Sequence, residues 1–116
     1  MKSGELVKLV INTLDEQKGL QISDFNVTAL TDLADHVIIC SATSKRHANA
    51  LADKVIRRAK ENGVRPLGVE GETEAEWILI DLHDVIIHIM LPEVRNFYSL
   101  EKLWSMVENA RQRYED

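Results

Sequence analysis

Apolar residues repeat at helical spacing near the start of the chain, in residues 4–18. Such a repeat gives one stripe of side chains that can face a core. Ser3 stands where a helix N-cap is expected, and Lys18-Gly19 offers a cation and a left-handed residue at the other end. The pattern therefore predicts a first helix with the stripe Leu6, Val7, Val10, Ile11 and Leu14.

Two later segments show the same spacing. Residues 45–62 predict a helix that is capped by Thr43 or Ser44 and closed by Gly63. Its apolar face consists of Ala48, Leu51, Ala52, Val55, Ile56 and Ala59. A last helix, capped by Ser99, is predicted to present Leu100, Leu103, Val107, Ala110 and Tyr114 on one face.

The segments between these helices have strand character. Residues 22–28 alternate loosely between apolar and polar side chains, which predicts a strand. Residues 35–42, DHVIICSA, are β-branched and almost continuously apolar, as is typical of a strand inside a sheet. Pro66 is expected to open a short strand, because proline is tolerated at a strand start or on a sheet edge.

Residues 77–91 contain two strand-like runs, WILIDL and DVIIHIML, with almost nothing between them. They predict a β-hairpin with a two-residue loop at Leu82-His83 or at His83-Asp84. In either register one face is purely aliphatic and must be core; it holds Ile78, Ile80, Val85, Ile87, Ile89 and Leu91. The opposite face is chemically mixed and holds Trp77, Leu79, Asp81, Ile86, His88 and Met90.

The predicted order of elements is α-β-β-α-β-β-β-α, which indicates an α/β fold with a mixed β-sheet and flanking helices. The chain has 116 residues, of which 45% are hydrophobic, and this suits one domain over residues 1–116 with a single core. No apolar run exceeds four residues, so no membrane span is expected. The first residues lack the apolar stretch of a signal peptide, which favours a cytoplasmic protein.

Charge is distributed unevenly along the chain, whose net charge is −5. Residues 45–65 carry seven basic and two acidic side chains, whereas residues 66–93 carry seven acidic side chains and no lysine or arginine. An acidic stretch of this kind repels phosphates and attracts a basic protein surface, although solvated loops and strand edges explain the composition more simply. The basic helix is compatible with contact to nucleic acid, although a solvated helix face explains it more simply.

Motifs for catalysis or cofactor binding are missing. The chain has no HExxH, GxSxG, GxGxxG or GxxxxGK[ST] motif, and no DxD pair preceded by Gly-Ser as in a nucleotidyltransferase. Cys40 is the only cysteine and lies within a predicted strand, so it is expected to be a buried, inert thiol. Asp81 and His88 share a hairpin face and form the one candidate acid–base pair. Neither a metal nor another cofactor is expected.

The mixed hairpin face is the best candidate for a binding surface. Trp77, Leu79, Ile86 and Met90 supply large apolar groups beside Asp81 and His88, a composition typical of protein interfaces. The physical pattern is equally compatible with a face that one of the protein's own helices covers.

Four blocks of sequence then resemble a known family. LADHVIICSATSKRHANALADKV, PLGVEGE, EWILIDLHDVIIHIM and RNFYSLEKLW follow one another with the spacing of the ribosomal silencing factor family (RsfS, Iojap-like). The resemblance covers about residues 24–104. Two positions depart from the family pattern: His83 stands where glycine is usual, and His36 stands where an aromatic residue is frequent.

The resemblance implies a translational repressor without enzymatic activity, whose fold is similar to nucleotidyltransferases that lack the catalytic acids. Such a protein binds the large ribosomal subunit, chiefly through its ribosomal protein fourteen, and blocks joining of the small subunit when nutrients are scarce. The resemblance is also compatible with a secondary contact to ribosomal RNA and with formation of a homodimer. The residues expected to bind the partner are Glu70, Trp77, Leu79, Asp81, His88, Met90, Arg95 and Tyr98. For Arg95, a structural hydrogen-bonding role is nearly as well supported. The rival hypotheses are a small nucleotide-acting enzyme that uses His88 and Asp81, and an RNA-binding module that uses helix 45–62.

Overall fold

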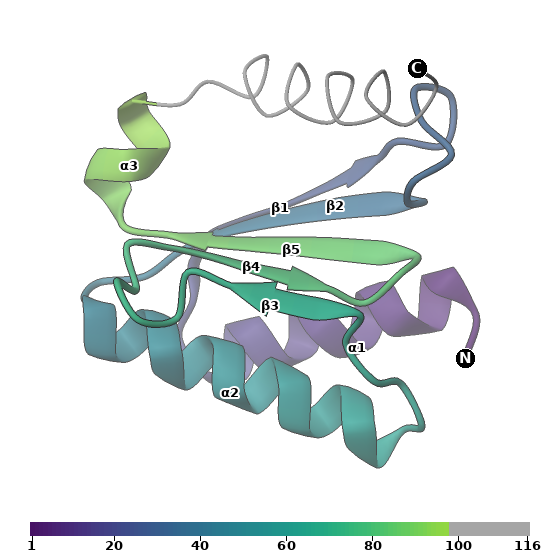
Figure 1. Cartoon of the computed structure of the whole chain (residues 1–116), viewed down its shortest axis with the longest axis horizontal. Helices are drawn as coiled ribbons and strands as arrows, with labels where there is room; N and C mark the ends of the chain where they lie inside the picture. Colours follow the sequence, from purple (N-terminus) through teal and green to yellow (C-terminus); the bar gives the residue numbers. More distant parts are fainter. Residues whose placement is uncertain (98–116) are drawn as a thin grey trace.

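The computed structural model describes residues 1–97, which form one five-stranded sheet with flanking helices (Figure 1). The elements are α1 (Ser3–Glu16), β1 (Leu20–Asn26), β2 (His36–Ser41), α2 (Lys45–Glu61), β3 (Gly68–Glu70), β4 (Trp77–Asp81), β5 (Val85–Met90) and α3 (Pro92–Phe97). The short α3 was not among the predicted elements. The helix predicted after Ser99 lies outside the described residues.

The sheet has the strand order β1-β2-β5-β4-β3. β2 and β5 run parallel, and the other neighbouring pairs are antiparallel, so the predicted mixed sheet is confirmed. Together β2 and β5 form the middle of the sheet, which explains why their sequences are the most continuously apolar. The short β3 lies at one edge, as the position of Pro66 predicts.

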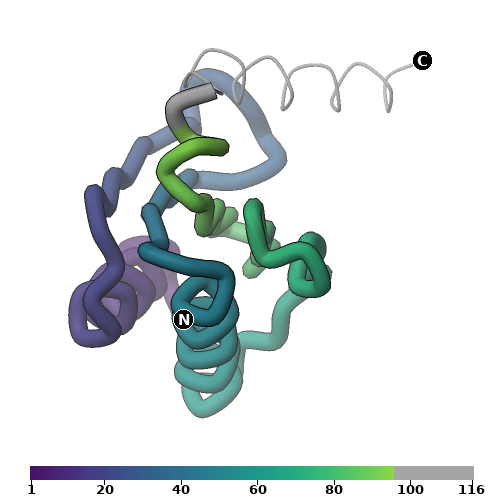
Figure 2. Tube along the Cα trace, turned by 90° about the vertical axis from the view of Figure 1, so that its left-hand side faces the viewer, coloured from purple at the N-terminus to yellow at the C-terminus, as the bar shows by residue number. Residues whose placement is uncertain are grey.

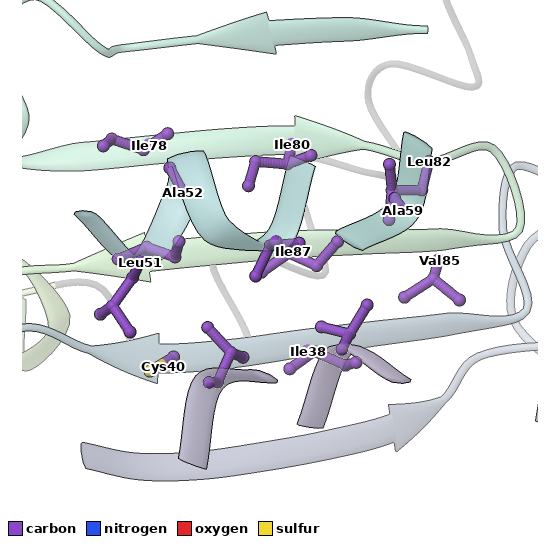
Figure 3. Close-up of a cluster of buried hydrophobic side chains, with 14 of the residues drawn as sticks. Ile38, Cys40, Leu51, Ala52, Ala59, Ile78, Ile80, Leu82, Val85 and Ile87 are labelled. Atoms are coloured by element: carbon purple, nitrogen blue, oxygen red, sulfur yellow. The ribbon is translucent and has the colours of Figure 1, made fainter. Parts of the chain in front are cut away.

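α1 and α2 lie side by side on one face of the sheet (Figures 1 and 2). Their apolar stripes pack on the aliphatic side of the hairpin and on Ile38 and Cys40 of β2, and the predicted core is confirmed. Figure 3 shows these side chains meeting between the helices and the strands. Each fully buried aliphatic side chain contributes about 1.5–3 kcal/mol to stability, which makes this layer the main source of folding energy.

The opposite face of the sheet carries a second, smaller cluster of apolar residues. Its buried members are Val27, Ala34, Val37, Ile39 and Met90, and Phe25, Trp77, Ile86 and Val94 pack against them. The segment that joins β1 to β2 supplies Val27 and Ala34, and α3 supplies Val94. Two parts of the chain that are far apart in sequence therefore cover this face: α3 follows the end of β5, and the β1–β2 segment lies beside its start, where the Asp35 N–H donates to the Asp84 carbonyl.

The start and end of α1 differ from the prediction. Ser3 is the first helical residue and its side chain caps no backbone N–H; its hydroxyl donates instead to the Asp35 carboxylate. At the other end the left-handed residue is Lys18, with a φ of 63°, and not Gly19. Gly19 is needed for space, because a Cβ there would lie 2.6 Å from the Cys40 Sγ.

The start of α2 is fastened to the end of α1. Ser44 is the N-cap and its side chain accepts a hydrogen bond from the His47 N–H, as predicted. The His47 Nδ1 accepts a hydrogen bond from the Thr43 N–H at 3.0 Å. The His47 Nε2 therefore carries the proton and donates to the Gln17 carbonyl, 2.9 Å away. One imidazole thus joins the end of α1 to the start of α2.

The hairpin register selects one of the two predicted loops. Leu82 donates its N–H to the Val85 carbonyl, which leaves His83-Asp84 as the two-residue loop and confirms both predicted faces. His83 has a φ of 76°, a conformation that favours glycine, and its N–H donates to the Asp81 Oδ1 at 2.8 Å. The chain therefore keeps the backbone that glycine would adopt at this position.

Replacement of His83 by glycine is expected to raise the free energy of unfolding by about 0.5–1 kcal/mol, because it removes left-handed strain at an exposed position. Urea denaturation of the purified proteins measures the change. His83→Ala is the matched control: it removes the same imidazole but keeps a Cβ at positive φ. Equal stabilities of the glycine and alanine variants would show that the turn is unstrained.

Candidate functional site

An open pocket of about 270 Å³ lies on the side of the sheet that α1 and α2 leave uncovered, toward the β3 edge. It is lined by Glu70, Gly71, Trp77, Leu79 and His88. Four of these five residues belong to the predicted partner-binding set. The structure thus brings half of the predicted residues together around one concave feature.

Strand pairing explains why these side chains meet. Leu79 of β4 pairs with Glu70 of β3 on one side and with His88 of β5 on the other. The three residues therefore form a row across three strands, with their side chains on one face of the sheet. Trp77 is two residues before Leu79 and points to the same face, where it closes the end of the row.

Gly71 shapes the pocket through its backbone. Its φ is 86°, and a Cβ at this position would lie 2.0 Å from the Trp77 carbonyl oxygen. Only glycine therefore lets the chain leaving β3 lie this close to the start of β4. The sequence analysis did not select this residue; the signal was its place in VEGE, directly after the selected Glu70.

Trp77 and His88 are joined by a hydrogen bond. The indole Nε1–H donates to the His88 Nδ1 at 2.9 Å, and the two ring centroids are 5.8 Å apart. An accepting Nδ1 places the imidazole proton on Nε2. Burial lowers the pKa of His88 to about 4, so the ring is neutral at pH 7. The buried imidazole thus holds the half-buried indole in one orientation.

The candidate acid–base pair is not formed. The register places His88 opposite Leu79, whereas Asp81 lies opposite Ile86 at the hairpin end. Among the hydrogen bonds of residues 1–97 none joins Asp81 to His88: Asp81 accepts from the His83 N–H, and the His88 Nδ1 accepts from Trp77. Asp81 is also not one of the pocket-lining residues.

Met90 does not belong to an exposed surface. It is 1% exposed and belongs to the second apolar cluster, so at Met90 the hairpin face is covered, which is one of the two possibilities that the sequence pattern left open. The physical reason is that Met90 ends β5 where α3 begins, and Val94 of α3 packs in the same cluster. Trp77, Leu79, Asp81 and Ile86 remain half-buried, which restricts the accessible part to the β4 side.

Arg95 has a structural role in α3. Its guanidinium donates to the Gln21 carbonyl at 2.7 Å, to the Ser41 Oγ at 2.8 Å and to the Ser23 Oγ at 3.3 Å. It therefore ties α3 to β1 and β2, and this agrees with the hydrogen-bonding role weighed for it. Tyr98, the last of the predicted binding residues, lies outside the described residues.

Other candidate chemistry finds no support within residues 1–97. No group of three or more histidine, cysteine, aspartate or glutamate residues is placed to hold a metal ion there. Burial raises the pKa of the Cys40 thiol to about 11, which keeps it protonated and unreactive. None of the helices described there is both long and apolar enough to cross a membrane.

The fold and the pocket define a mixed-sheet α/β protein with a largely apolar recess that Glu70 borders. The chain belongs to the ribosomal silencing factor family: the family model described as "Ribosomal silencing factor during starvation" matches residues 1–116. Membership places the chain among regulators and not among enzymes.

Individual relatives agree with this assignment. The Ribosomal silencing factor RsfS of Haemophilus influenzae is 42% identical over 100 residues, which are 86% of this chain and 98% of that protein. A crystal structure from Chromobacterium violaceum has a TM-score of 0.86 and 40% identity, and covers 90% of this chain and 88% of its own. A crystal structure from Bacillus halodurans has a TM-score of 0.80 and 35% identity, over 87% of this chain and 94% of its own.

Replacement of Gly71 by alanine is expected to lower the free energy of unfolding by about 2–4 kcal/mol, because the new Cβ meets backbone at positive φ. Gly63→Ala is the matched control: Gly63 has a φ of 79° but no atom within 4 Å of the added Cβ, so its cost is about 1 kcal/mol. Urea denaturation compares them. If the two variants lose the same stability, Gly71 is not constrained by Trp77.

The buried, neutral His88 predicts a dependence of stability on pH. Its pKa is about 4 in the folded protein, against 6.5 for an unperturbed histidine, so between these values the unfolded chain binds the proton first. Stability contributed by this group is therefore present above pH 6.5 and is lost as the pH falls to 4, by about 3 kcal/mol in total.

His88→Asn is the control for this pH effect, because its amide oxygen can accept the Trp77 hydrogen bond but does not titrate. Urea denaturation at several pH values between about 4 and 7 should give a steeper loss of stability for the parent protein than for this variant. Parallel curves would mean that His88 is not held neutral by burial.

Proposed function

We propose that this protein is a translational repressor of the cytoplasm that binds the large ribosomal subunit through the Trp77 pocket and prevents the small subunit from joining. The direct partner is ribosomal protein fourteen of the large subunit, and the repression lowers translation when nutrients are limiting. The observation that carries the proposal is an aromatic, acid-rimmed pocket in a chain that belongs to the ribosomal silencing factor family.

The pocket has the physical features of a protein-binding hot spot. Tryptophan is among the residues most enriched at the energetic centres of interfaces, and Trp77 forms one wall here. The hydrogen bond to His88 fixes the indole before the partner arrives. Binding then costs less side-chain entropy, since the anchor is already in place.

Charge around the pocket favours a basic partner. Glu70, Glu72, Glu74 and Glu76 are all exposed on β3 and the segment that leads from it to β4. Glu70 lines the pocket, and Glu72 and Glu74 add negative charge on the segment that follows it, whereas Glu76 forms an ion pair with Lys45 at 3.7 Å. This acidic segment repels exposed RNA phosphates and attracts a basic ribosomal protein. Electrostatic attraction mainly accelerates association, and apolar contacts with Trp77 and Leu79 supply the residence time.

Blocking of subunit joining by this domain requires no catalytic activity. A folded α/β domain seated on a surface that another subunit must contact blocks that contact by its volume. The separate positions of Asp81 and His88 give no support to the rival hypothesis of a nucleotide-acting enzyme.

A second contact, with ribosomal RNA, is favoured by α2. Arg46, Arg57 and Lys60 are exposed, and within residues 1–97 no carboxylate pairs with them. α2 packs on the aliphatic face of the sheet, so its cations lie on the other side of the sheet from the pocket. A simultaneous contact with RNA therefore requires RNA on a separate side of the bound domain.

Replacement of Trp77 by alanine is expected to weaken binding to isolated large subunits by about 2–4 kcal/mol, because it removes the aromatic anchor. Cosedimentation with purified large subunits measures the affinity. Subsequent addition of small subunits should give intact ribosomes with the variant but free subunits with the parent protein.

Leu20→Ala is the matched control, since Leu20 is a 46% exposed apolar residue on the far edge strand β1. It should bind as the parent protein does. Thermal denaturation of both variants tests for a general loss of structure. A Trp77→Ala variant that unfolds easily but binds subunits normally when folded would assign the residue to the core and not to the interface.

A further inference from the structure

The chemistry of the pocket is more selective than that of a general apolar recess. Four of its five lining residues carry no charge at pH 7, because His88 is held neutral by burial. The fifth is Glu70, which is exposed at the rim. The pocket surface formed by Trp77 and Leu79 is thus uncharged, and the Glu70 carboxylate lies beside it.

The size of the pocket limits what it can take. A volume of about 270 Å³ is smaller than the roughly 300–1,000 Å³ of sites that enclose drug-sized molecules. A single long side chain is a better match. The proposed partner is a protein, so a protruding side chain is also the kind of group that its surface would present.

We propose that the pocket receives one arginine or lysine side chain of the partner protein, with the methylene stem on Trp77 and Leu79 and the cationic head beside the Glu70 carboxylate. The inference rests on the proposed function for its partner and adds the chemistry of the group that is recognised. Long cationic side chains combine an apolar stem with a charged end. The pocket has the matching arrangement, with apolar walls at Trp77 and Leu79 and a carboxylate at Glu70.

Several features favour a cation over an apolar group. Glu70 makes no ion pair within the described residues, and residues 66–93 contain no lysine or arginine that could compete for it. An apolar side chain would take water away from this carboxylate without replacing it, which is unfavourable. A cation would gain a charge-assisted hydrogen bond and would also lie near the Trp77 ring, where cations are attracted.

Arginine suits the site better than lysine. A planar guanidinium can stack on an indole and donate two hydrogen bonds to one carboxylate, whereas an ammonium group is a point charge with a tighter hydration shell. The neutral state of His88 matters here, because a protonated imidazole in the wall would repel either cation.

The first test uses a small probe that does not require ribosomes. Argininamide is titrated into the protein while the indole N–H resonance of Trp77, assigned with Trp77→Phe, is followed by NMR; citrullinamide is the uncharged control of the same shape. We expect a saturable shift with argininamide, about tenfold weaker binding of citrullinamide, and a similar tenfold loss in Glu70→Gln. Equal responses to the two probes, or no saturable response, would overturn the inference.

The second test separates a local contact from the general acidic field. Glu70→Gln and Glu74→Gln change the net charge equally, but Glu74 does not line the pocket. We expect Glu70→Gln to weaken cosedimentation with large subunits about tenfold and Glu74→Gln less than about twofold. Equal losses of affinity in the two variants would show that only the overall negative potential matters, and the cationic subsite would be rejected.

The two proposals fail in different ways. If the parent protein does not bind large subunits while argininamide binds in a manner that depends on Glu70, the ribosomal function is wrong and the subsite stands. If large subunits bind and lose affinity in Trp77→Ala but not in Glu70→Gln, the ribosomal function stands and the occupant of the pocket is not a cation.

Discussion

Burial of the aliphatic face of β4 and β5 beneath α1 and α2 is the constraint on which the rest of the structure depends. Side chains alternate along a strand, so a face that is fully committed to the core leaves the intervening residues on the other side. Those residues include Trp77, Leu79 and His88. The composition of the core therefore determines which side of the sheet can hold the pocket.

The second face of the sheet has a covered part and an open part. At the end of β5, α3 follows Met90, and Arg95 fastens α3 through three hydrogen bonds to β1 and β2; the β1–β2 segment covers the same face beside the start of β5. Toward β3 the face stays open, and Gly71 permits the close approach of the chain to Trp77. The covered part also stabilises the open part, because the Trp77 indole packs against the apolar cluster that contains Met90.

His88 links the two parts of this face. It is buried enough to remain neutral, and its Nδ1 is occupied by the Trp77 indole. His88, which was predicted to be a partner contact or a base, thus supports the orientation of the Trp77 indole. The same burial removes a positive charge from the pocket wall, and among residues 1–97 this leaves Glu70 as the only charged lining residue.

The sequence by itself determined the order of the helices and strands from α1 to β5, both hairpin faces, the aliphatic core and the family, but not α3. These follow from local spacing and from the sequence blocks that carry the family resemblance, and need no knowledge of distant contacts. Only the tertiary structure decided that Met90 is covered and that Arg95 joins α3 to β1 and β2 by hydrogen bonds. It also decided that Asp81 and His88 do not form a pair and that Gly71 shapes the pocket. Each of these outcomes depends on strand register or on a contact between segments far apart in the chain, such as Arg95 with Gln21. Periodicity shows which face a residue occupies, but not what the rest of the chain places over it.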